Sequence, residues 1–444
     1  MAASRLAQEE IPAVERVAAR LARIAAENAR SAIFISVDGP GALAAAEASD
    51  RRRRDGRRLG PLDGTILAVK DNLALRGLPR TAGTAAFRDA VSDEDALCVA
   101  RLRAQGAIVL GTLNMHEGAL GATTDNPFFG RCRNPLAPER TPGGSSGGSG
   151  AAAAAGLADL ALGTDTMGSA RIPAAYCGVF GLKPTDGMIP RDGMAFLSEQ
   201  LDTVGPLAAD PLLLLPALAA MAAGEGARDP FRLTPPRDWA EAPAALEGAR
   251  ILCPAQVEEV DCEPEIRAGL DAAIARLEAA GARVLRAPLE GWRPGRDRRG
   301  GLLLIEAEGA RLFEPHLAPG ATPALGADFA ALLRYGAGIS APRLTEALGR
   351  MRASAAALAR GLAEHDLVLL PTAPQRAFPF DGPTPANQAD FTCLANFAGC
   401  PALAMPVAAA DGGLPASVQL IGPRWSDARL CAIAGTLFPG GRAG

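Results

Sequence analysis

The chain has 444 residues, which is enough for one large domain or for two to three ordinary ones, and 48% of these residues are hydrophobic. Its net charge of −4 at pH 7 excludes a general electrostatic attraction to nucleic acid. Its eight cysteines form no CxxC pair and its three histidines form no HExxH arrangement, so the composition predicts no metal site, no disulfide framework and reduced thiols in a cytoplasmic protein.

The first part of the chain predicts helices and strands in alternation. Apolar residues at helical spacing begin the chain, and short apolar runs bounded by glycine follow them. The predicted elements are helices over 11–29 and 40–54, a strand over 65–69 that ends at Lys70, a helix over 93–103 with acidic residues in its first turn, and a strand over 107–113.

The second half of the chain continues this alternation. Apolar runs over 249–253, 366–370, 402–407 and 418–421 predict strands, and the patterns over 264–280 and 343–364 predict helices. We therefore expect an α/β sheet that is covered by helices on both faces. The longest apolar stretches are too short to span a bilayer and no signal peptide is visible, so no membrane association is expected.

Lysine is rare in this chain: of 45 basic residues, two are lysines, Lys70 and Lys183, and 43 are arginines (45 − 2). A buried lysine can lose its proton and act as a base, whereas arginine keeps its charge. The two lysines are therefore candidates for chemistry that arginine cannot perform. The competing interpretation is that codon usage explains the arginines and leaves two lysines without a special role.

A glycine- and serine-rich segment covers 141–150 and reads TPGGSSGGSG. By itself this composition favours a flexible linker. The alanine run over 151–155 favours a different interpretation, in which the segment is a tight turn that leads into a helix and leaves backbone N–H groups free for an anion.

A second glycine-containing turn follows a short apolar strand over 160–162. It covers 163–169 and reads GTDTMGS, which places Ser169 where backbone N–H groups converge. The pattern is not a GxSxG elbow, so an ordinary α/β-hydrolase is disfavoured. Asp165 and Arg171 are expected to be ion-pairing supports of this turn.

Several motifs in order resemble the amidase signature family of serine hydrolases. They are AVKDN (68–72), GGSSGGS (143–149), GTDTMGSARIP (163–173), CGVFGLKPT (177–185), LDTVGPL (201–207) and FAGCP (397–401). The resemblance covers nearly the whole chain. It implies a single large α/β domain with a central twisted mixed sheet, made of N-terminal helices (1–60), a signature core (61–207) and a C-terminal part that completes the sheet and the substrate pocket (208–444).

The resemblance also implies a catalytic triad. It assigns the nucleophile to Ser169, the bridging serine to Ser145 after a cis peptide from Gly144, and the base to Lys70. The implied reaction is acyl transfer from a carboxamide through an acyl-enzyme, with no cofactor and no metal. Lys183 is expected to brace the fold near this site.

The turn before Ser169 is expected to hold the oxyanion through the N–H groups of Thr166, Met167 and Gly168. Relatives often carry glycine where this chain has Met167, and a long side chain there narrows the site. Small or planar amides are therefore the expected substrates.

Further residues are implied at the substrate pocket. The resemblance names Gly118, Ala119, Asp125 and Gly144 as pocket candidates. His116 lies in the same segment, and we expect it to be structural more often than substrate-binding.

Three functions remain open. The leading one is a stand-alone amidase acting on a small-molecule amide; a biuret or ureide hydrolase is a variant of it. The second is the glutaminase (A) subunit of a tRNA-dependent amidotransferase. That protein binds glutamine through an acidic residue where this chain has Ala389, with Asp390 next to it. The third is a non-catalytic binding homologue, against which the intact triad argues. A homodimer or a small accessory subunit is compatible with the resemblance, and direct nucleic-acid binding is not expected.

Overall fold

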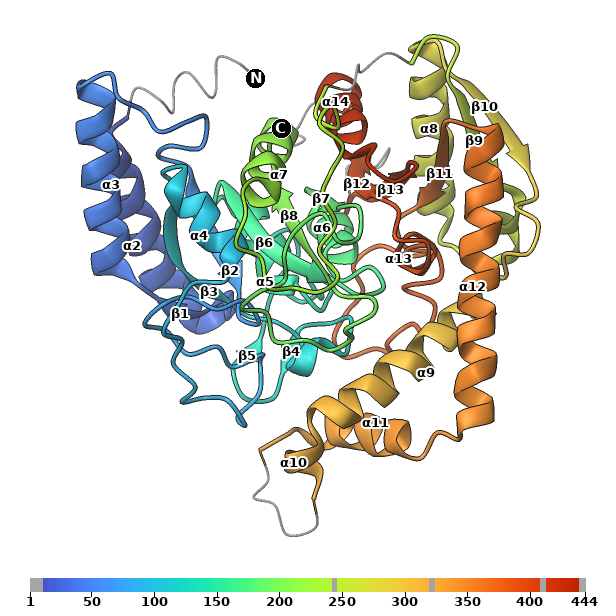
Figure 1. Cartoon of the computed structure of the whole chain (residues 1–444), viewed down its shortest axis with the longest axis horizontal. Helices are drawn as coiled ribbons and strands as arrows, with labels where there is room; N and C mark the ends of the chain where they lie inside the picture. The colour runs from blue at the N-terminus through green and yellow to red at the C-terminus, as the bar shows by residue number, and fades with distance from the viewer. Residues whose placement is uncertain (1–10, 242–245, 319–323, 408–412, 439–444) are drawn as a thin grey trace.

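The computed structural model describes residues 11–241, 246–318, 324–407 and 413–438, and it contains a large mixed sheet flanked by helices (Figure 1). The 11 strands lie in the order β1-β3-β2-β6-β8-β7-β12-β13-β11-β9-β10. These strands are β1 (Phe34–Val37), β2 (Ile66–Lys70), β3 (Ile108–Leu113), β6 (Leu160–Asp165), β7 (Phe180–Lys183), β8 (Thr203–Ala208), β9 (Arg250–Pro254), β10 (Arg283–Ala287), β11 (Leu367–Pro371), β12 (Ala402–Val407) and β13 (Ala416–Ile421). A two-stranded ribbon pairs β4 (Asp125–Asn126) with β5 (Gly130–Arg131). The expected α/β fold class is confirmed.

The helices of the described residues connect these strands. They are α2 (Ala13–Ser31), α3 (Gly39–Arg54), α4 (Leu97–Ala104), α5 (Gly147–Ala154), α6 (Arg171–Cys177), α7 (Leu214–Ala222), α8 (Pro264–Ala279), α9 (Pro294–Leu312), α10 (Glu314–Leu317), α11 (Ala327–Ala337), α12 (Ala341–Glu364), α13 (Cys393–Phe397) and α14 (Asp427–Leu437). Short 3-10 turns cover Glu117–Ala119, Pro211–Leu213 and Ala255–Glu259.

Both faces of the central strands are buried, as β2 demonstrates. Ile66 and Ala68 belong to the apolar cluster formed with α2, α3, α5 and α6. Leu67 and Val69 point to the opposite face and belong to the cluster that includes α4 and α7. Because side chains alternate along a strand, a strand covered on both faces is apolar throughout. This explains why β2 reads as a continuous apolar run that ends in Lys70.

Two local expectations need correction. Helix α4 begins at Leu97, so the acidic residues over 93–95 precede the helix and do not form its first turn. Asp95 accepts a hydrogen bond from the Arg76 N–H and pairs with Arg103. The segment 1–60, expected as helices, also contributes strand β1, which is antiparallel to β3. That strand has four residues and carries no strong periodic signal.

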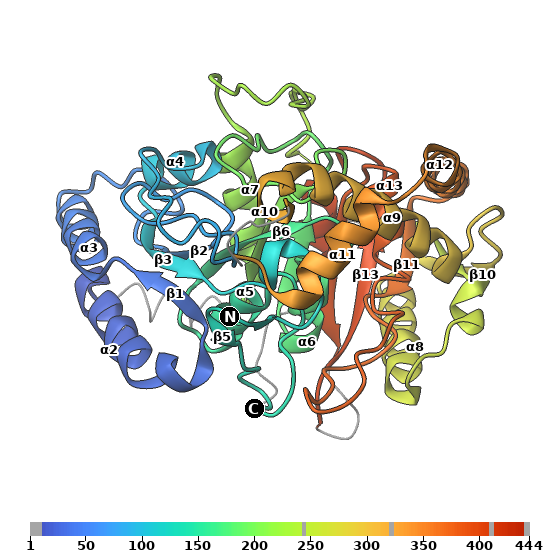
Figure 2. The ribbon, with the colours of Figure 1, turned by 90° about the horizontal axis from the view of Figure 1, so that it is seen from below.

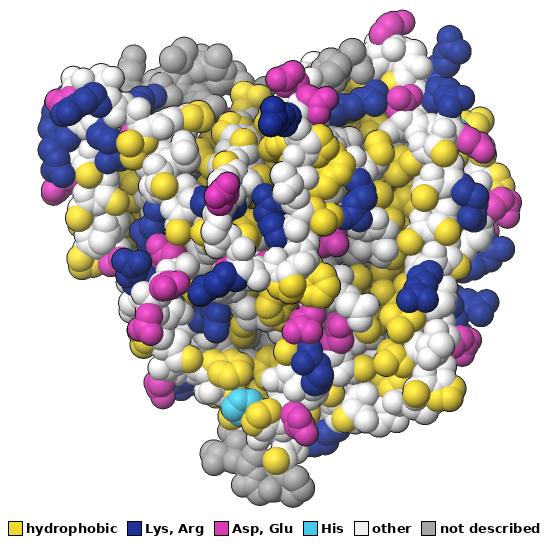
Figure 3. Space-filling model, viewed as in Figure 1, with side chains coloured by type: hydrophobic (Ala, Val, Ile, Leu, Met, Phe, Trp, Pro, Cys, Tyr) yellow, Lys and Arg dark blue, Asp and Glu magenta, His cyan; other side chains and the backbone are white. Residues whose placement is uncertain are grey.

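Helices α9 and α11 lie across the lower part of the molecule in the orientation of Figure 1, and Figure 2 shows them in front of the strands. On the face drawn in Figure 3, basic and acidic side chains are interspersed with hydrophobic ones, in keeping with the small net charge. Within the residues that the structure describes, no helix has both the length and the apolar character needed to cross a membrane.

Candidate active site

Three parallel strands end at one edge of the sheet and bring the predicted catalytic segments together. Strand β2 is parallel to both β3 and β6, so the carboxyl ends of these strands lie side by side. Lys70 ends β2 and Asp165 ends β6. The antiparallel strand β8 begins at this edge, where Thr203 is paired with Asp165. The edge therefore gathers Lys70, the turn after β6 and the segment before β8.

The amine of Lys70 lies between two hydroxyl groups. Its Nζ is 2.8 Å from Ser145 Oγ and 2.7 Å from Thr164 Oγ1, and the side chain is 0% exposed. Asn72 Nδ2 donates a hydrogen bond to the same Thr164 Oγ1 at 3.2 Å. Thr164 therefore accepts from both side chains and fixes the position of the amine. Sequence reasoning did not single out Thr164 or Asn72, although both lie inside the recognised motifs.

The electrostatic surroundings of Lys70 favour its neutral form near neutral pH. Burial lowers the pKa of Lys70 to about 7, because the protein interior solvates an ammonium group poorly. The carboxylates of Asp202 and Asp165 attract the ammonium and limit this decrease. Asp202 is itself buried and accepts a hydrogen bond from Thr166 Oγ1 at 2.5 Å. The amine is therefore balanced between its two protonation states.

Ser145 precedes α5, and its peptide bond with Gly144 is cis. The His116 N–H donates to the Ser145 carbonyl oxygen at 2.9 Å. Helix α5 begins at Gly147, which confirms the interpretation of this segment as a turn and helix start and excludes a flexible linker. A Cβ atom on Gly148 would lie 2.3 Å from the Asn114 carbonyl oxygen, so the helix approaches β3 at a distance that glycine permits.

Ser169 lies in the turn between β6 and α6, next to the segment of Ser145. Its carbonyl oxygen accepts a hydrogen bond from the Ser146 N–H at 3.1 Å. Ser169 is partly exposed, whereas Ser145 is fully buried. The turn depends on Gly168, which has φ +123°, and a Cβ atom there would lie 2.3 Å from Thr392 Oγ1. The backbone thus presents Ser169 at the solvent-accessible side of the lysine-serine pair.

A buried ion-pair network supports this turn. Arg171 donates through Nε and Nη2 to the two carboxylate oxygens of Asp165, at 3.0 Å each. The same guanidinium donates to Gln419 Oε1 at 2.7 Å and to Asn396 Oδ1 at 2.6 Å. Although burial alone would raise the pKa of the Asp165 carboxyl, Arg171 and Asn396 hold it well below its usual range. The expectation that Asp165 and Arg171 are structural supports is confirmed.

The N–H groups of this turn differ in their availability. The Gly168 N–H donates to Asp165 Oδ1 at 2.7 Å, so it faces the carboxylate, which corrects the expectation that it faces a substrate oxyanion. Within the described residues, the N–H groups of Thr166, Met167 and Ser169 donate to no acceptor. Three N–H groups close to Ser169 are therefore free to bind an anionic oxygen.

Helix α11 covers two of the expected pocket residues. Gly118 has φ +57°, and a Cβ atom on it would lie 2.0 Å from Phe329 Cζ. Ala119 also has a positive φ, of 63°, and belongs to the same apolar cluster as Met167 and Phe329. Gly118 and Ala119 therefore lie under an apolar wall that sequence reasoning missed, because that wall comes from a helix about 200 residues further along the chain.

The other two pocket candidates have different surroundings. Gly144 is packed closely, since a Cβ atom there would lie 2.8 Å from the backbone of Ala122. Asp125 accepts hydrogen bonds from Arg131 Nε at 3.1 Å and from Arg131 Nη2 at 2.8 Å. Its carboxylate is therefore committed to an ion pair within the β4–β5 ribbon.

His116 and Lys183 have structural contacts. His116 Nδ1 accepts a hydrogen bond from the Thr124 N–H at 3.2 Å, and burial lowers the pKa of His116 to about 4. A neutral imidazole that accepts from the backbone fits a structural role. Lys183 Nζ donates to the Pro184 carbonyl at 2.8 Å, and burial lowers the pKa of Lys183 to about 8. Lys183 forms no hydrogen bond to the serine turns within the described residues.

A charged pair lies close to the turn that carries Ser169. Arg298 of α9 donates through Nε to Asp390 Oδ1 at 2.5 Å, and both side chains are largely buried. Two residues beyond Asp390, Thr392 Oγ1 donates to the Met167 carbonyl at 2.6 Å. Gly301 lies one turn of α9 beyond Arg298 and packs closely against Met167, since a Cβ atom added to Gly301 would lie 2.7 Å from Met167 Sδ. Helix α9 therefore joins the Arg298–Asp390 pair to the turn.

The family model described as Amidase matches residues 15–295 and 330–431. The chain therefore belongs to the amidase family, as its motifs indicate, and it is an enzyme of the kind that acts on carbon–nitrogen bonds.

The relatives include several kinds of enzyme. The A subunit of the glutamyl-tRNA(Gln) amidotransferase of Acidothermus cellulolyticus is 35% identical over 98% of this chain and 92% of its own length. A chain from a vestigial protein complex, described as revealing the evolutionary origins of an s-triazine catabolic enzyme, superposes with a TM-score of 0.89 at 30% identity and covers 98% of both chains. The native peptide amidase of Stenotrophomonas maltophilia superposes with a TM-score of 0.81 at 32% identity, over 97% of this chain and 94% of that one.

Proposed function

We propose that this protein hydrolyses a carboxamide through an acyl-enzyme on Ser169, with Ser145 and Lys70 completing a Ser-Ser-Lys triad. The observation that carries the proposal is the buried amine of Lys70, 2.8 Å from Ser145 Oγ, with its pKa lowered to about 7. A base with a pKa near the working pH combines a large neutral fraction with adequate proton affinity. The free N–H groups beside Ser169 supply the second requirement, an anion-binding turn.

The proposed reaction begins with a proton relay. A neutral amine has one lone pair and two N–H groups. Because Lys70 donates to Thr164 Oγ1, its lone pair can turn toward Ser145. Ser145 passes its proton to Lys70 Nζ and takes the proton of Ser169, whose Oγ forms a bond to the carbonyl carbon. The asparagine at position 72 supports this arrangement, because it donates to the same threonine oxygen.

The tetrahedral intermediate then collapses. Its negative oxygen binds the N–H groups of Thr166, Met167 and Ser169, and the loss of one such donor typically costs about 3 kcal/mol of transition-state stabilisation. The carbon–nitrogen bond breaks as Ser145 gives a proton to the leaving nitrogen and recovers one from Lys70. Ammonia or an amine departs. Water then attacks the ester, and the same relay, in the same order, releases the carboxylic acid and restores Ser169.

For the substrate, the relatives named as A subunits of an amidotransferase favour glutamine over a stand-alone amide. The Arg298–Asp390 pair supports this choice, because an α-amino acid beside the turn can bind its α-carboxylate to Arg298 and its α-ammonium group to Asp390 in exchange for part of the contact between the two side chains. Ala389, which stands where the acidic residue of the glutaminase is expected, packs with apolar clusters, and the neighbouring Asp390 supplies the carboxylate instead. This function needs partner proteins and brings tRNA back as a partner, against the expectation of no nucleic acid.

A small amide or ureide is the second candidate. The close approach of both Met167 Sδ and the Phe397 ring to Gly301 supports it, because these contacts narrow the space beside the turn. The chain that superposes with a TM-score of 0.89 comes from a complex related to s-triazine catabolism. A cytoplasmic location belongs to both proposals, and the eight free cysteines support it.

Turnover assays on the purified chain test these proposals. Glutamine, biuret and small carboxamides are offered with ammonia release as the measurement, and Ser169→Ala provides the blank. Active chain should also be labelled by a fluorophosphonate at Ser169. Lys70→Arg should be nearly inactive, because arginine keeps the charge but cannot act as the base. Labelling that persists in Ser169→Ala, or substantial turnover by Lys70→Arg, would refute the triad. Turnover of glutamine over biuret supports the first substrate, and the reverse order supports the second.

A further inference from the structure

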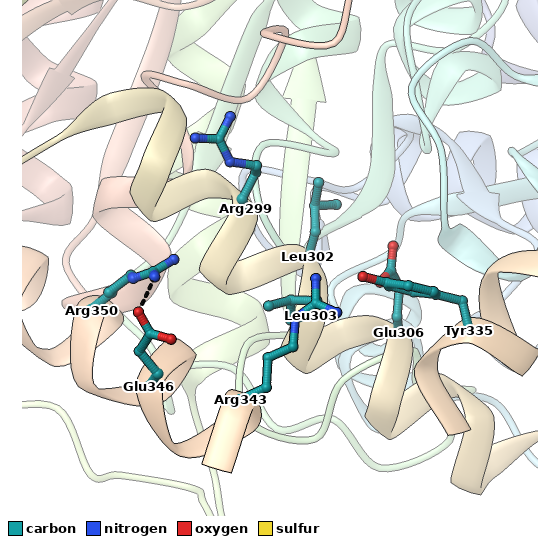
Figure 4. A pocket seen from close by; sticks show the side chains of 8 residues that line it. All are labelled: Arg299, Leu302, Leu303, Glu306, Tyr335, Arg343, Glu346 and Arg350. Atoms are coloured by element: carbon teal, nitrogen blue, oxygen red, sulfur yellow. Dashed lines mark hydrogen bonds and ion pairs between the residues drawn. The ribbon is translucent and has the colours of Figure 1, made fainter. Parts of the chain in front are cut away.

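A cavity of about 320 Å³ lies between α9, α11 and α12, and no part of the proposed function uses it. Figure 4 shows Glu306 of α9, Tyr335 of α11 and Arg343 of α12 pointing into this space from three different helices. Leu302 and Leu303 form the apolar part of its wall. We call it the α9–α12 cavity.

The cavity and the serine turn lie on different, adjacent sides of α9. Successive residues of an α-helix are rotated by about 100°, so Leu302 and Glu306 share one side of α9, while Gly301 and Ile305 lie on another. Gly301 is the residue that packs against Met167 of the turn. Ser169 is not one of the residues that line the α9–α12 cavity.

Glu306 is the unusual residue of this cavity. It is 7% exposed, and its carboxylate makes no hydrogen bond and no ion pair with any residue that the structure describes. Burial raises the pKa of Glu306 to about 7, and Arg343 opposes this rise. The carboxylate oxygens of Glu306 are not among the fully enclosed oxygens that lack a partner, so they face the open side of the cavity as an acceptor that a ligand can reach.

Two arginines of the cavity lack an anionic partner. Arg343 lies over the ring of Tyr335, with its guanidinium carbon 5.5 Å from the ring centroid. Arg343 and Arg299 are both exposed at the rim of the cavity, and neither is within ion-pairing distance of a carboxylate in the described ranges. Arg350, by contrast, is already paired with Glu346. The cavity thus offers unpaired cations and one unpaired anion that face the same space but do not pair with each other.

We propose that the α9–α12 cavity binds a small α-amino carboxylate, such as a free amino acid, whose ammonium group binds Glu306 and whose carboxylate binds Arg343. A simple anion would leave the Glu306 carboxylate without a donor and would be repelled by it. A simple cation would be repelled by Arg343 and Arg299. A zwitterion satisfies both sets of groups, and its side chain can lie against Leu302. This inference is independent of the reaction at Ser169.

Calorimetric titration of the full chain tests this proposal with three ligands of similar size. L-Alanine carries both charged groups, propionate lacks the ammonium group and ethylamine lacks the carboxylate. Alanine should bind, and each analogue should bind at least about tenfold more weakly, because each loses one charge-assisted interaction. Equal binding of propionate would show an anion site only, and absence of alanine binding would overturn the proposal.

Single substitutions test whether alanine binds in the α9–α12 cavity. Glu306→Gln and Arg343→Gln should each weaken alanine binding by about tenfold or more. Arg352→Gln is the matched control, because Arg352 is exposed on the same helix as Arg343 and does not line the cavity. Because the Arg298–Asp390 pair could itself bind an amino acid, Arg298→Gln is compared with Glu306→Gln: it should leave the alanine binding that depends on Glu306 unchanged. If Arg298→Gln removes all alanine binding and Glu306→Gln removes none, the ligand lies beside the serine turn and the proposal is refuted. Thermal melting of Glu306→Gln verifies that the variant is folded.

Discussion

Asp202→Asn should move the pH dependence of the reaction to lower pH. The Asp202 carboxylate is buried near Lys70 and is the largest of the charges that hold the pKa of Lys70 up, against the effect of burial. The substitution keeps the shape of the side chain, and its amide oxygen can still accept from the Leu197 and Ser198 N–H groups. The change therefore removes a charge while it preserves the local packing.

The size of the effect follows from Coulomb's law. A charge at a few ångströms in a protein interior contributes one to a few kcal/mol, so its loss should lower the pKa of Lys70 from about 7 by roughly one unit. Because the neutral amine is the base, activity rises with pH through this pKa. At pH 6 the neutral fraction should increase from roughly a tenth to roughly a half, which is about a fivefold gain in rate.

The rate of fluorophosphonate labelling of Ser169 between pH 5 and 9 measures this shift without any knowledge of the substrate. The exposed Asp238 provides the control, and Asp238→Asn should leave the profile unchanged. A midpoint for Asp202→Asn that stays in place or moves to higher pH would show that Lys70 is not the titrating base.

Three further substitutions probe stability. Lys70→Met should be inactive but at least as stable as the natural protein at pH 6. The pKa of Lys70 is about 7 in the folded state and 10.5 in the unfolded state, so the ionised amine destabilises the fold most below pH 7, and the difference in melting temperature should shrink as the pH rises toward 10. A large loss of stability at pH 6 would show that the buried ammonium group does not destabilise the fold. Gly168→Ala should lower the free energy of unfolding, measured in urea, by about 2 kcal/mol or more and should abolish fluorophosphonate labelling of Ser169, because Gly168 has φ +123° and its Cβ atom would meet Thr392. Gly349→Ala is the control: a Cβ atom there meets nothing within 4 Å, and the substitution should stabilise the helix by about 0.5–1 kcal/mol. Arg171→Lys should lower the free energy of unfolding by about 3 kcal/mol, because lysine cannot replace the two buried hydrogen bonds from Arg171 to Asp165. An unchanged unfolding curve would show that this ion-pair network adds no stability.

Local sequence was sufficient where a short pattern determines its own conformation. The apolar run before Lys70 predicted β2, and the glycines before the alanine run predicted the turn into α5. The resemblance to the amidase signature family implied that Lys70 and Ser145 share one site, and the structure brings Lys70 Nζ within 2.8 Å of Ser145 Oγ. Strand β2 and the turn into α5 each depend on residues within a few positions of one another, so the sequence predicts them directly; the contact between Lys70 and Ser145 joins positions 75 residues apart and followed from the family resemblance alone.

Local patterns carried no signal where the outcome depends on distant segments. The Gly168 N–H was expected to bind an oxyanion, but it is taken by Asp165, whose position is set by Arg171 and by residues more than 200 positions away, including Asn396. Helix α4 started four residues later than its acidic residues predicted, because Asp95 pairs with other partners.

The sequence by itself therefore determined the chemical groups of this protein: a lysine, two serines and glycine turns in a fixed order. The tertiary structure alone decided how these groups behave. The pKa of Lys70 falls to about 7 because the fold buries its amine against Thr164, and the apolar wall over Gly118 exists because α11 folds back onto it. Burial changes the free energy of ionising a side chain, and contacts between distant segments determine which surfaces are covered. Residues that are neighbours only in the chain predict neither effect.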